Sequence, residues 1–259
     1  MNAVRATVFV LFLPLLTAFS SSFCPLEAIG LGASSALASA SPAVRVSAQA
    51  KLCKSFRDKG LAYPPRDVTF LVIKDEMNME IWSKDDHGKD VLVDVYDFVA
   101  SGRCGPKLAR GDLQVPEGFY KVVGLNPNSR YHLSMKLDYP NRFDIDMAKS
   151  DGRRSLGGDI FIHGNAKSMG CIAVGDRGIE ELYQLVSDAG VGNVRVIIAP
   201  YDFRDMPIVK INSASLPKWA PALYKDIERE MARFAKSVKR PQPAAIPNPP
   251  VRTVSATAQ

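Results

Sequence analysis

The sequence predicts a mainly β protein with flanking helices, an α+β chain whose strands form a β-sandwich or an open barrel. Three observations support this fold class. Many short apolar runs alternate with turns rich in glycine, proline and asparagine, a pattern typical of strands. One long loop, residues 102–117, is rich in glycine, proline and charge, and loops of this length inside a domain are usually functional. Three further segments place apolar residues at helical spacing.

The apolar runs give the order of the strands. We expect strands at residues 68–74, 79–83, 91–100, 119–123, 131–137, 160–162, 172–174 and 194–199. The polar stretch 75–78 predicts a hairpin between the first two, and Asn126-Pro127-Asn128-Ser129 predicts the turn between the fourth and fifth. Residues 142–158, which contain three glycines, predict an irregular segment near the functional site.

Three helices are predicted. The first lies within residues 48–61, with Gly60 as its stop. The second follows Asp176, which is expected to be its N-cap, and ends at Gly190. The third lies within residues 213–238, starts at Pro217 and carries an apolar stripe on one side.

The two ends of the chain differ from its middle. Residues 1–40 combine Arg5, an apolar core at residues 6–19 and small residues after it, which predicts a signal segment and linker and therefore export. The core is shorter than the roughly 20 apolar residues that span a membrane, although an uncleaved anchor stays an alternative. Residues 239–259 are rich in proline, which predicts a disordered tail.

The charge of the chain is concentrated at its C-terminal end. The net charge is +6, and residues 236–259 hold four basic residues and no acid. The rest of the chain therefore carries only about +2, which argues against a nucleic-acid partner because such a partner needs a clustered basic face. Contact with a membrane is expected only through the signal segment or through this basic tail, which could also meet anionic envelope polymers.

The cysteines are few and unevenly spaced. Cys24 lies in the signal segment. An exported protein can form disulfides, and Cys53–Cys104 is the pairing that leaves Cys171 free. The sequence alone does not decide whether this disulfide forms. There is no Cys-x-x-Cys or His-rich spacing, so we expect no metal site, and no feature of the sequence predicts a cofactor.

Residues 159–173, Asp-Ile-Phe-Ile-His-Gly-Asn-Ala-Lys-Ser-Met-Gly-Cys-Ile-Ala, carry the predicted chemistry. A short buried strand ends at His163, a polar loop follows, and Gly170 permits a sharp bend that presents Cys171. A cysteine is nucleophilic as a thiolate, and a nearby histidine supplies the base that forms it. The backbone N–H groups of Gly170 and Cys171 are candidates for stabilising an oxyanion.

The pattern His163-Gly164, a short loop, then Ser168-x-Gly170-Cys171 resembles the catalytic motif of the L,D-transpeptidase family of bacterial cell-wall enzymes. Further stretches resemble the subgroup of that family without a separate wall-binding module: Gly105-Pro106-Lys107, Gly111-Asp112, Pro116-Glu117-Gly118-Phe119-Tyr120 and Tyr139-Pro140-Asn141. The resemblance covers about residues 68–209, and we place the catalytic domain at residues 66–212. It independently implies the fold class predicted above.

The resemblance implies acyl transfer on peptidoglycan stem peptides through a thioester. Cys171 would be the nucleophile, His163 the proton donor and acceptor, and the Gly170 N–H an oxyanion donor. The bond attacked would lie on the carboxyl side of an L-configured centre, typically diaminopimelate followed by a D-residue. Supporting or substrate-contacting roles are expected for Gly164, Ser168, Asp159, Lys107 and Tyr131. The expected location is the periplasm or cell envelope.

Two alternatives stay open. Many family members have His directly before the Gly-Cys and Arg or Asn two places after it, where this chain has Met169 and Ala173. These departures tilt the expectation slightly toward hydrolysis of a stem-peptide amide, or of an amide between peptidoglycan and a wall-anchored protein. A non-catalytic envelope-binding module is the alternative from another class. A papain-like protease is excluded because the histidine precedes the cysteine by eight residues.

Overall fold

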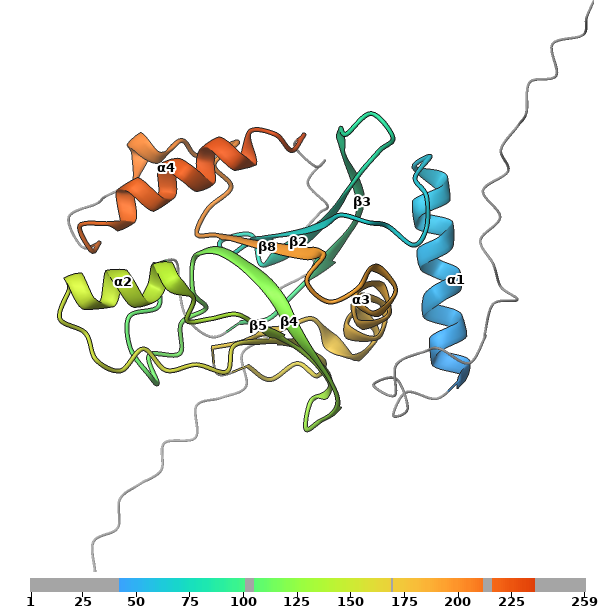
Figure 1. The fold of residues 1–259 in the computed structure, drawn as a ribbon, viewed down its shortest axis with the longest axis horizontal. Helices are drawn as coiled ribbons and strands as arrows, with labels where there is room; N and C mark the ends of the chain where they lie inside the picture. The colour runs from blue at the N-terminus through green and yellow to red at the C-terminus, as the bar shows by residue number, and fades with distance from the viewer. Residues whose placement is uncertain (1–41, 101–104, 169, 212–215, 236–259) are drawn as a thin grey trace, which may run out of the picture.

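The computed structural model describes residues 42–100, 105–168, 170–211 and 216–235, which Figure 1 shows in colour. The elements in chain order are α1 (Pro42–Asp58), β1 (Val68–Ile73), β2 (Asn78–Lys84), β3 (Asp90–Asp97), β4 (Gly118–Ser129), β5 (His132–Leu137), α2 (Arg142–Ser150), β6 (Phe161–His163), β7 (Ile172–Ala173), α3 (Gly175–Ala189), β8 (Val194–Ala199), η2 (Ile208–Lys210) and α4 (Ala220–Met231). The predicted signal segment 1–40 and tail 239–259 lie outside the described residues.

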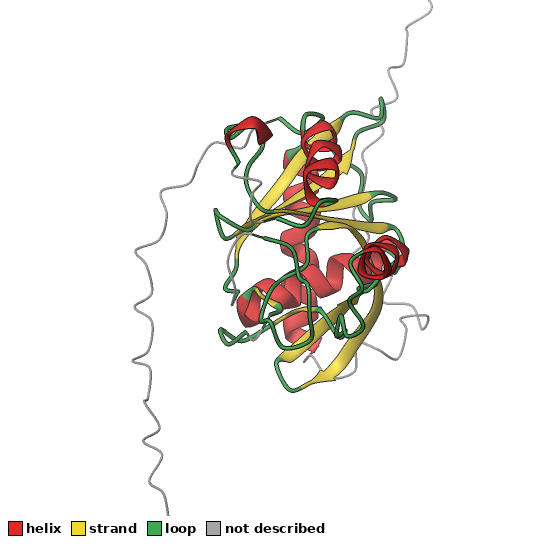
Figure 2. Cartoon of the chain, turned by 90° about the vertical axis from the view of Figure 1, so that its left-hand side faces the viewer, coloured by secondary structure: helices red, strands yellow, loops and turns green. Residues whose placement is uncertain are grey.

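The eight strands form one mixed sheet in the order β3-β2-β1-β8-β4-β5-β6-β7. Neighbours are antiparallel except β1 with β8 and β6 with β7. Val99, two residues beyond β3, forms an antiparallel bridge with Ala173 of β7, so the two ends of the sheet meet there. Figure 2 shows the strands in an upper and a lower group rather than in one flat layer. This arrangement, with helices outside it, confirms the predicted mainly β fold with flanking helices.

The strand β1 separates two hydrophobic cores. Successive side chains of a strand point to opposite faces, and here Phe70 and Val72 pack in the core shared with α1 and α3, while Leu71 and Ile73 pack in the core shared with α4. Both faces are therefore buried, which explains why the sequence of β1 is a continuous apolar run rather than an alternating one. In Figure 1, α4 lies on one side of β2 and β8, and α3 and α1 lie on the other.

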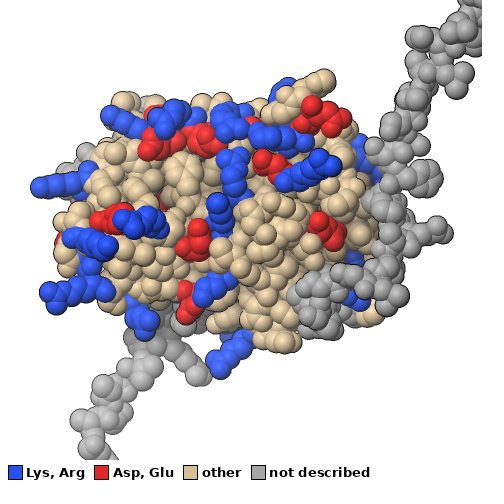
Figure 3. Space-filling view, in the orientation of Figure 1, with Lys and Arg blue, Asp and Glu red and all other residues tan. Residues whose placement is uncertain are grey.

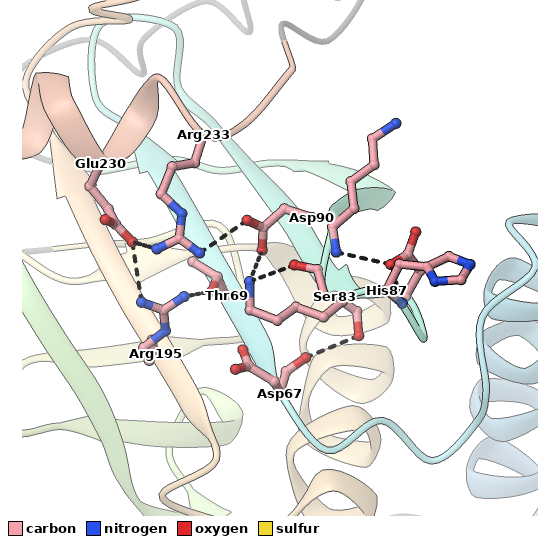
Figure 4. A network of polar contacts seen from close by, with 12 residues as sticks. Asp67, Thr69, Ser83, His87, Asp90, Arg195, Glu230 and Arg233 are labelled. Atoms are coloured by element: carbon pink, nitrogen blue, oxygen red, sulfur yellow. Dashed lines mark hydrogen bonds and ion pairs between the residues drawn. The ribbon is translucent and has the colours of Figure 1, made fainter.

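Charged side chains fix the position of α4 on the sheet (Figure 4). Arg233, just beyond α4, bonds to Glu230 at 2.6 Å and reaches Asp90 of β3 at 3.2 Å. Arg195 of β8 contacts Glu230 at 3.3 Å and donates to the Thr69 hydroxyl at 3.0 Å. Partly exposed ion pairs contribute only about 0–1 kcal/mol each, so this network orients the helix more than it stabilises the fold.

A buried ion pair holds the end of the long loop. The Nζ of Lys74 lies 2.8 Å from Glu117 Oε1 and also donates to the carbonyl of Gly105 at 2.9 Å. Tyr224 of α4 donates its hydroxyl hydrogen to the other oxygen of Glu117 at 2.5 Å. Lys74 and Glu117 are 8% and 2% exposed, so the pair lies in the interior. The loop is therefore attached at this point both to the end of β1 and to α4.

Two predicted boundaries are wrong. Residues 142–158 are not irregular throughout, because α2 occupies Arg142–Ser150. Its start is a capping box, in which Asn141 accepts from the Asp144 N–H and Asp144 accepts from the Asn141 N–H. The strand β4 also runs through the expected turn at 126–129, and it pairs Ser129 with His132, so that the turn consists of residues 130 and 131.

Other features agree with the predictions or lie outside the described residues. The hairpin of β1 and β2 and the strand β8 are confirmed, whereas α1 begins at Pro42, earlier than expected. Cys53 is disulfide-bonded. The proposed partner Cys104 lies outside the described residues, so the pairing stays a prediction. Within the part of the chain that is described, none of the helices has both the length and the apolar character needed to cross a membrane.

The surface charge is mixed. On the face drawn in Figure 3, Lys and Arg side chains are interspersed with Asp and Glu. This face shows no continuous basic area of the kind that a nucleic acid requires.

Candidate active site

The parallel pair β6 and β7 places the predicted catalytic residues. His163 is the last residue of β6, and Cys171 directly precedes β7. The register sets Ile162 opposite Ile172 and His163 opposite Ala173. Because side chains alternate between the two faces of a sheet, this register puts Cys171 on the same face as His163, two residues along from Ala173, which lies opposite His163.

His163 is held by its own neighbour. The ring is almost fully buried, at 2% exposure, and its Nδ1 lies 2.6 Å from the carbonyl oxygen of Gly164. A carbonyl oxygen only accepts hydrogen bonds, so Nδ1 carries the hydrogen and Nε2 of the neutral ring has a free lone pair. Burial lowers the pKa of His163, and the hydrogen bond to Gly164 offsets this only in part. His163 is therefore neutral at neutral pH, with Nε2 able to take a proton.

The surroundings of Gly164 leave no room for a side chain. A Cβ at this position would lie 2.7 Å from the carbonyl oxygen of Tyr131 and 2.8 Å from Oδ1 of Asp176. The ring of Tyr131 also stacks on that of His163, with 4.5 Å between centroids and 31° between planes. The imidazole is thus enclosed by a glycine on one side and an aromatic ring on the other.

Asp176 does not cap α3 as expected. The helix begins two residues earlier than this cap would set it, at Gly175, and its N-cap position, Val174, makes no side-chain hydrogen bond. The carboxylate of Asp176 instead accepts a hydrogen bond from the N–H of Asn165 at 2.7 Å. Asp176 therefore fixes the loop that follows His163, a role that the capping pattern did not predict.

Cys171 is a free, half-buried thiol. Its Sγ donates to the backbone carbonyl of Asp159 at 3.8 Å. Burial raises the pKa of the thiol, and a hydrogen bond from the Phe161 backbone and the charge of Lys107 counter this only in part. Among the described residues no hydrogen bond joins Sγ to the ring of His163. The resting site therefore holds a neutral thiol and a neutral imidazole.

Ser168 fixes the backbone of Cys171. Its hydroxyl donates to the Cys171 carbonyl at 2.6 Å and accepts from the Cys171 N–H at 3.0 Å. The Cys171 N–H is therefore occupied, whereas the Gly170 N–H donates to no group within the described ranges. Gly170 has a φ of 105°, and a Cβ there would lie 3.3 Å from the backbone of Leu113. Of the two predicted oxyanion donors, the Gly170 N–H is thus the one that no described residue engages at rest.

An open cleft of about 290 Å³ exposes the thiol. Its walls come from four residues of the long loop, from residues 157–160, and from Gly170 and Cys171; the loop residues are Lys107, Arg110, Gly111 and Leu113. His163 does not line the cleft, which is consistent with its burial beneath the surface. A substrate that enters this cleft would thus meet the sulfur first.

A family model described as YkuD, the L,D-transpeptidase catalytic domain, matches residues 67–198. The match covers half of the chain and includes both His163 and Cys171. The chain belongs to the YkuD family. The resemblance to the L,D-transpeptidase family that the sequence motifs indicated is therefore confirmed.

Two curated relatives carry the name "Putative L,D-transpeptidase YafK", one from Escherichia coli K12 and one from Escherichia coli O157:H7. Each is 35% identical to this YkuD chain over 141 residues, which is 52% of this chain and 54% of the relative. The chain thus spans about half the length of the curated relatives it matches.

Two solved structures are similar to part of the chain at low identity. The helical cell shape determining protein Pgp2 of Campylobacter jejuni is 20% identical, with a TM-score of 0.44 over 64% of this chain and 68% of that one. Bd1075 of Bdellovibrio bacteriovorus is 17% identical, with a TM-score of 0.40 over 66% of this chain and 55% of that one.

The structure of the YkuD domain divides the predicted site residues into two groups. Those that line the cleft are Lys107, Asp159, Gly170 and Cys171. Those around the imidazole or the Cys171 backbone are Tyr131, Gly164 and Ser168. All of them therefore belong to one region of the domain.

The charges of Lys107 and Asp159 are matched by neighbours. Lys107 is 8% exposed and pairs with Asp112. Burial acts to raise the pKa of Asp112, but hydrogen bonds from the Ala109 N–H and from Lys107 outweigh it and hold that pKa below its usual value. Asp159 pairs with Lys136 at 2.8 Å, and this hydrogen bond lowers the pKa of Asp159.

Arg110 lines the cleft but was not among the predicted site residues. In the sequence it is one of several charged residues of a long loop, and unlike Lys107 it lies in none of the stretches that resemble the family. The folded loop shows that Lys107 and Arg110 both line the cleft and that, among the described residues, Lys107 has an ion-pair partner and Arg110 has none.

Proposed function

We propose that this YkuD domain is a cysteine acyltransferase that acts on peptidoglycan stem peptides, with residues 66–212 as the catalytic unit. One observation carries the proposal: an imidazole with a free Nε2 lies on the same face of a rigid strand pair as a free thiol that opens into a cleft. A thiol and a positioned base are the two groups that covalent acyl transfer by cysteine requires.

The first half-reaction forms a thioester. As Sγ of Cys171 attacks the peptide carbonyl carbon, the thiol proton passes to Nε2 of His163. The Gly170 N–H donates to the resulting oxyanion, and such a donor typically contributes about 100- to 1000-fold in rate. The C–N bond then breaks, and the proton on His163 passes to the leaving amine.

The raised pKa of Cys171 and the lowered pKa of His163 favour proton transfer during the attack over a preformed ion pair. A shift of the thiol away from the Asp159 carbonyl would accompany the transfer, since Sγ bonds to that carbonyl at rest. Catalytic hydrogen bonds often tighten only when substrate is bound.

In the second half-reaction an acceptor attacks the thioester and gives its proton to His163, which returns it to the departing sulfur. An amine of a second stem peptide or of a wall-anchored protein gives a new amide, and water gives hydrolysis. One observation favours water as a second candidate. Ala173 stands where many family members have Arg or Asn. It is 1% exposed and both its backbone groups bond to Val99, so this position offers no polar group to an amine acceptor.

This function places the protein outside the cytoplasmic membrane. The signal segment predicted at residues 1–40 would direct it to the periplasm or envelope, where peptidoglycan lies. The catalytic cycle described above uses side chains and backbone groups of the chain and assigns no step to a cofactor.

The test is product analysis. The full chain is incubated with purified muropeptides, and mass spectrometry follows dimers with a 3→3 link and shortened monomers. We expect one of these products with the native protein and none with Cys171→Ala. Dimers would identify transpeptidation, and monomers alone would identify hydrolysis. Activity that survives in Cys171→Ala would refute the nucleophile, and a native protein that binds muropeptides without converting them would support the envelope-binding module.

A further inference from the structure

One cation in the cleft, Arg110, forms no ion pair with a described residue. Lys107 is paired with Asp112, and Asp159 is paired with Lys136. The remaining charged residue of the lining, Arg110, is exposed, and its guanidinium makes no hydrogen bond or ion pair with any described residue. Its charge nevertheless contributes to lowering the pKa of Asp159, so it acts on the wall of the cleft.

The backbone of Arg110 is fixed although its side chain is free. The Arg110 N–H donates to the carbonyl of Ser155 at 2.9 Å. Gly157 packs so closely that a Cβ there would lie 3.2 Å from the Arg110 Cα, and its φ of 78° suits glycine. Arg110 therefore lines the same cleft as the Cys171 thiol from a backbone position that is fixed.

An arginine of this kind suits a planar anion. The guanidinium presents a fork of N–H donors that matches the two oxygens of a carboxylate, and it stays charged at any physiological pH. An unpaired guanidinium in a concave site binds an anion at a lower cost in free energy than one that must first break an ion pair.

We propose that Arg110 is the receptor for a carboxylate of the donor peptide and selects donors that carry a free carboxylate beside the scissile amide. The inference rests on the proposed function, and it names a specificity determinant that the motif does not contain. Two carboxylates share this chemistry: the C-terminal one of the residue that leaves, and the side-chain one of the residue that is acylated.

The experiment compares three synthetic tetrapeptide donors. One has both carboxylates free, one is amidated at the C-terminus, and one is amidated on the side chain next to the scissile bond. On the first donor, Arg110→Gln should lower kcat/KM about 10- to 100-fold, as expected for the loss of a charge-assisted hydrogen bond, and mainly through KM. On the donor that lacks the recognised carboxylate, the kcat/KM of the native protein should be lower by the same factor. On that donor Arg110→Gln should cause no further decrease in kcat/KM.

Two variants serve as controls. Arg110→Lys keeps the charge without the fork and should retain intermediate activity on the first donor. Arg57→Gln removes the same charge from an exposed position on α1 and should leave kcat/KM on all three donors unchanged. The rate of Cys171 alkylation by iodoacetamide should be the same in Arg110→Gln and the native protein, which shows that the thiol is intact.

The inference is overturned if Arg110→Gln matches the native protein on the first donor, or if it loses the same factor on all three. Calorimetry in a Cys171→Ala background separates this outcome from a failure of the proposed function. If donor affinity depends on one carboxylate and on Arg110, the proposed role of Arg110 is supported even where turnover is absent. If donor affinity depends on neither, that role is refuted.

Discussion

The thiol of Cys171 donates to the backbone carbonyl of Asp159, with 3.8 Å between Sγ and the oxygen, and no hydrogen bond joins it to His163 in the described part of the chain. The sulfur therefore rests as a thiol on a neutral acceptor. This differs from a cysteine site in which a thiolate and an imidazolium form a stable ion pair before substrate arrives.

The first prediction concerns the pH dependence of alkylation. Because burial raises the pKa of Cys171, the fraction of thiolate should keep growing as the pH rises past the usual thiol pKa of about 8.5. The rate constant for iodoacetamide should therefore rise through pH 7 to 9 without a plateau near neutrality. A plateau below pH 7 would indicate a preformed ion pair.

His163→Ala is the matched variant for this measurement. Since the resting thiol does not bond to the ring, its alkylation rate should change little. Turnover should nevertheless fall by about 100- to 10,000-fold, the usual contribution of a general base. A large fall in the alkylation rate would contradict this division of roles.

The second prediction concerns Gly164→Ala. The added methyl group would overlap the Tyr131 carbonyl and Ile179 Cγ2, at 2.7 and 2.9 Å, and overpacking of this kind costs roughly 1–3 kcal/mol. Thermal unfolding should show a lower Tm, and activity should fall because the acceptor for His163 Nδ1 shifts. Gly158→Ala, which meets nothing within 4 Å, is the stability control and should unfold like the native protein.

The third prediction concerns Ser168→Ala. The variant removes both hydrogen bonds that hold the Cys171 backbone, and small displacements of a reacting group can cost about 100-fold. Steady-state kinetics should show a lower kcat with little change in KM. Ser155→Ala, at an exposed position, should leave both kcat and KM unchanged. If KM rises instead while kcat is kept, Ser168 contacts substrate and does not position the thiol.

The fourth prediction concerns Glu117→Gln. The change leaves the ammonium of Lys74 buried without its partner, and breaking a buried pair in this way typically costs about 3–5 kcal/mol. Urea unfolding should show this loss, and Tyr224→Phe should show a smaller one of about 1 kcal/mol. Asp86→Asn, which is exposed, is the control. An unchanged midpoint for Glu117→Gln would mean that Lys74 reaches water.

The fold could be predicted largely because its strands are strongly patterned. The run Val68–Ile73 and the run Val194–Ala199 are each continuous and apolar, and both proved to be central strands buried on two faces. The helix α2 was missed because the three glycines that follow it suggested irregular structure, whereas its start depends on two reciprocal hydrogen bonds between Asn141 and Asp144.

The site could be predicted only as far as its motif extends. The motif names His163 and Cys171, but it does not show that the Cys171 N–H is already bonded to Ser168, which leaves Gly170 as the unengaged donor. It also gives no sign of Arg110, because the pairing of Lys107 with Asp112 is a tertiary feature of the loop. That Arg110 forms no ion pair with a described residue can be seen only in the folded loop.

The bridge between Val99 and Ala173 limits how a substrate can approach. Their N–H and carbonyl groups are exchanged at 2.8 and 2.9 Å, so at Ala173 the strand that follows the nucleophile is not an open edge. A peptide cannot bind there by adding itself as a further strand, which is a common mode of peptide capture. For the proposed acyltransferase, substrate recognition must come from side chains and loop backbone that surround the sulfur, and a change in these loops would alter substrate specificity without altering the sheet.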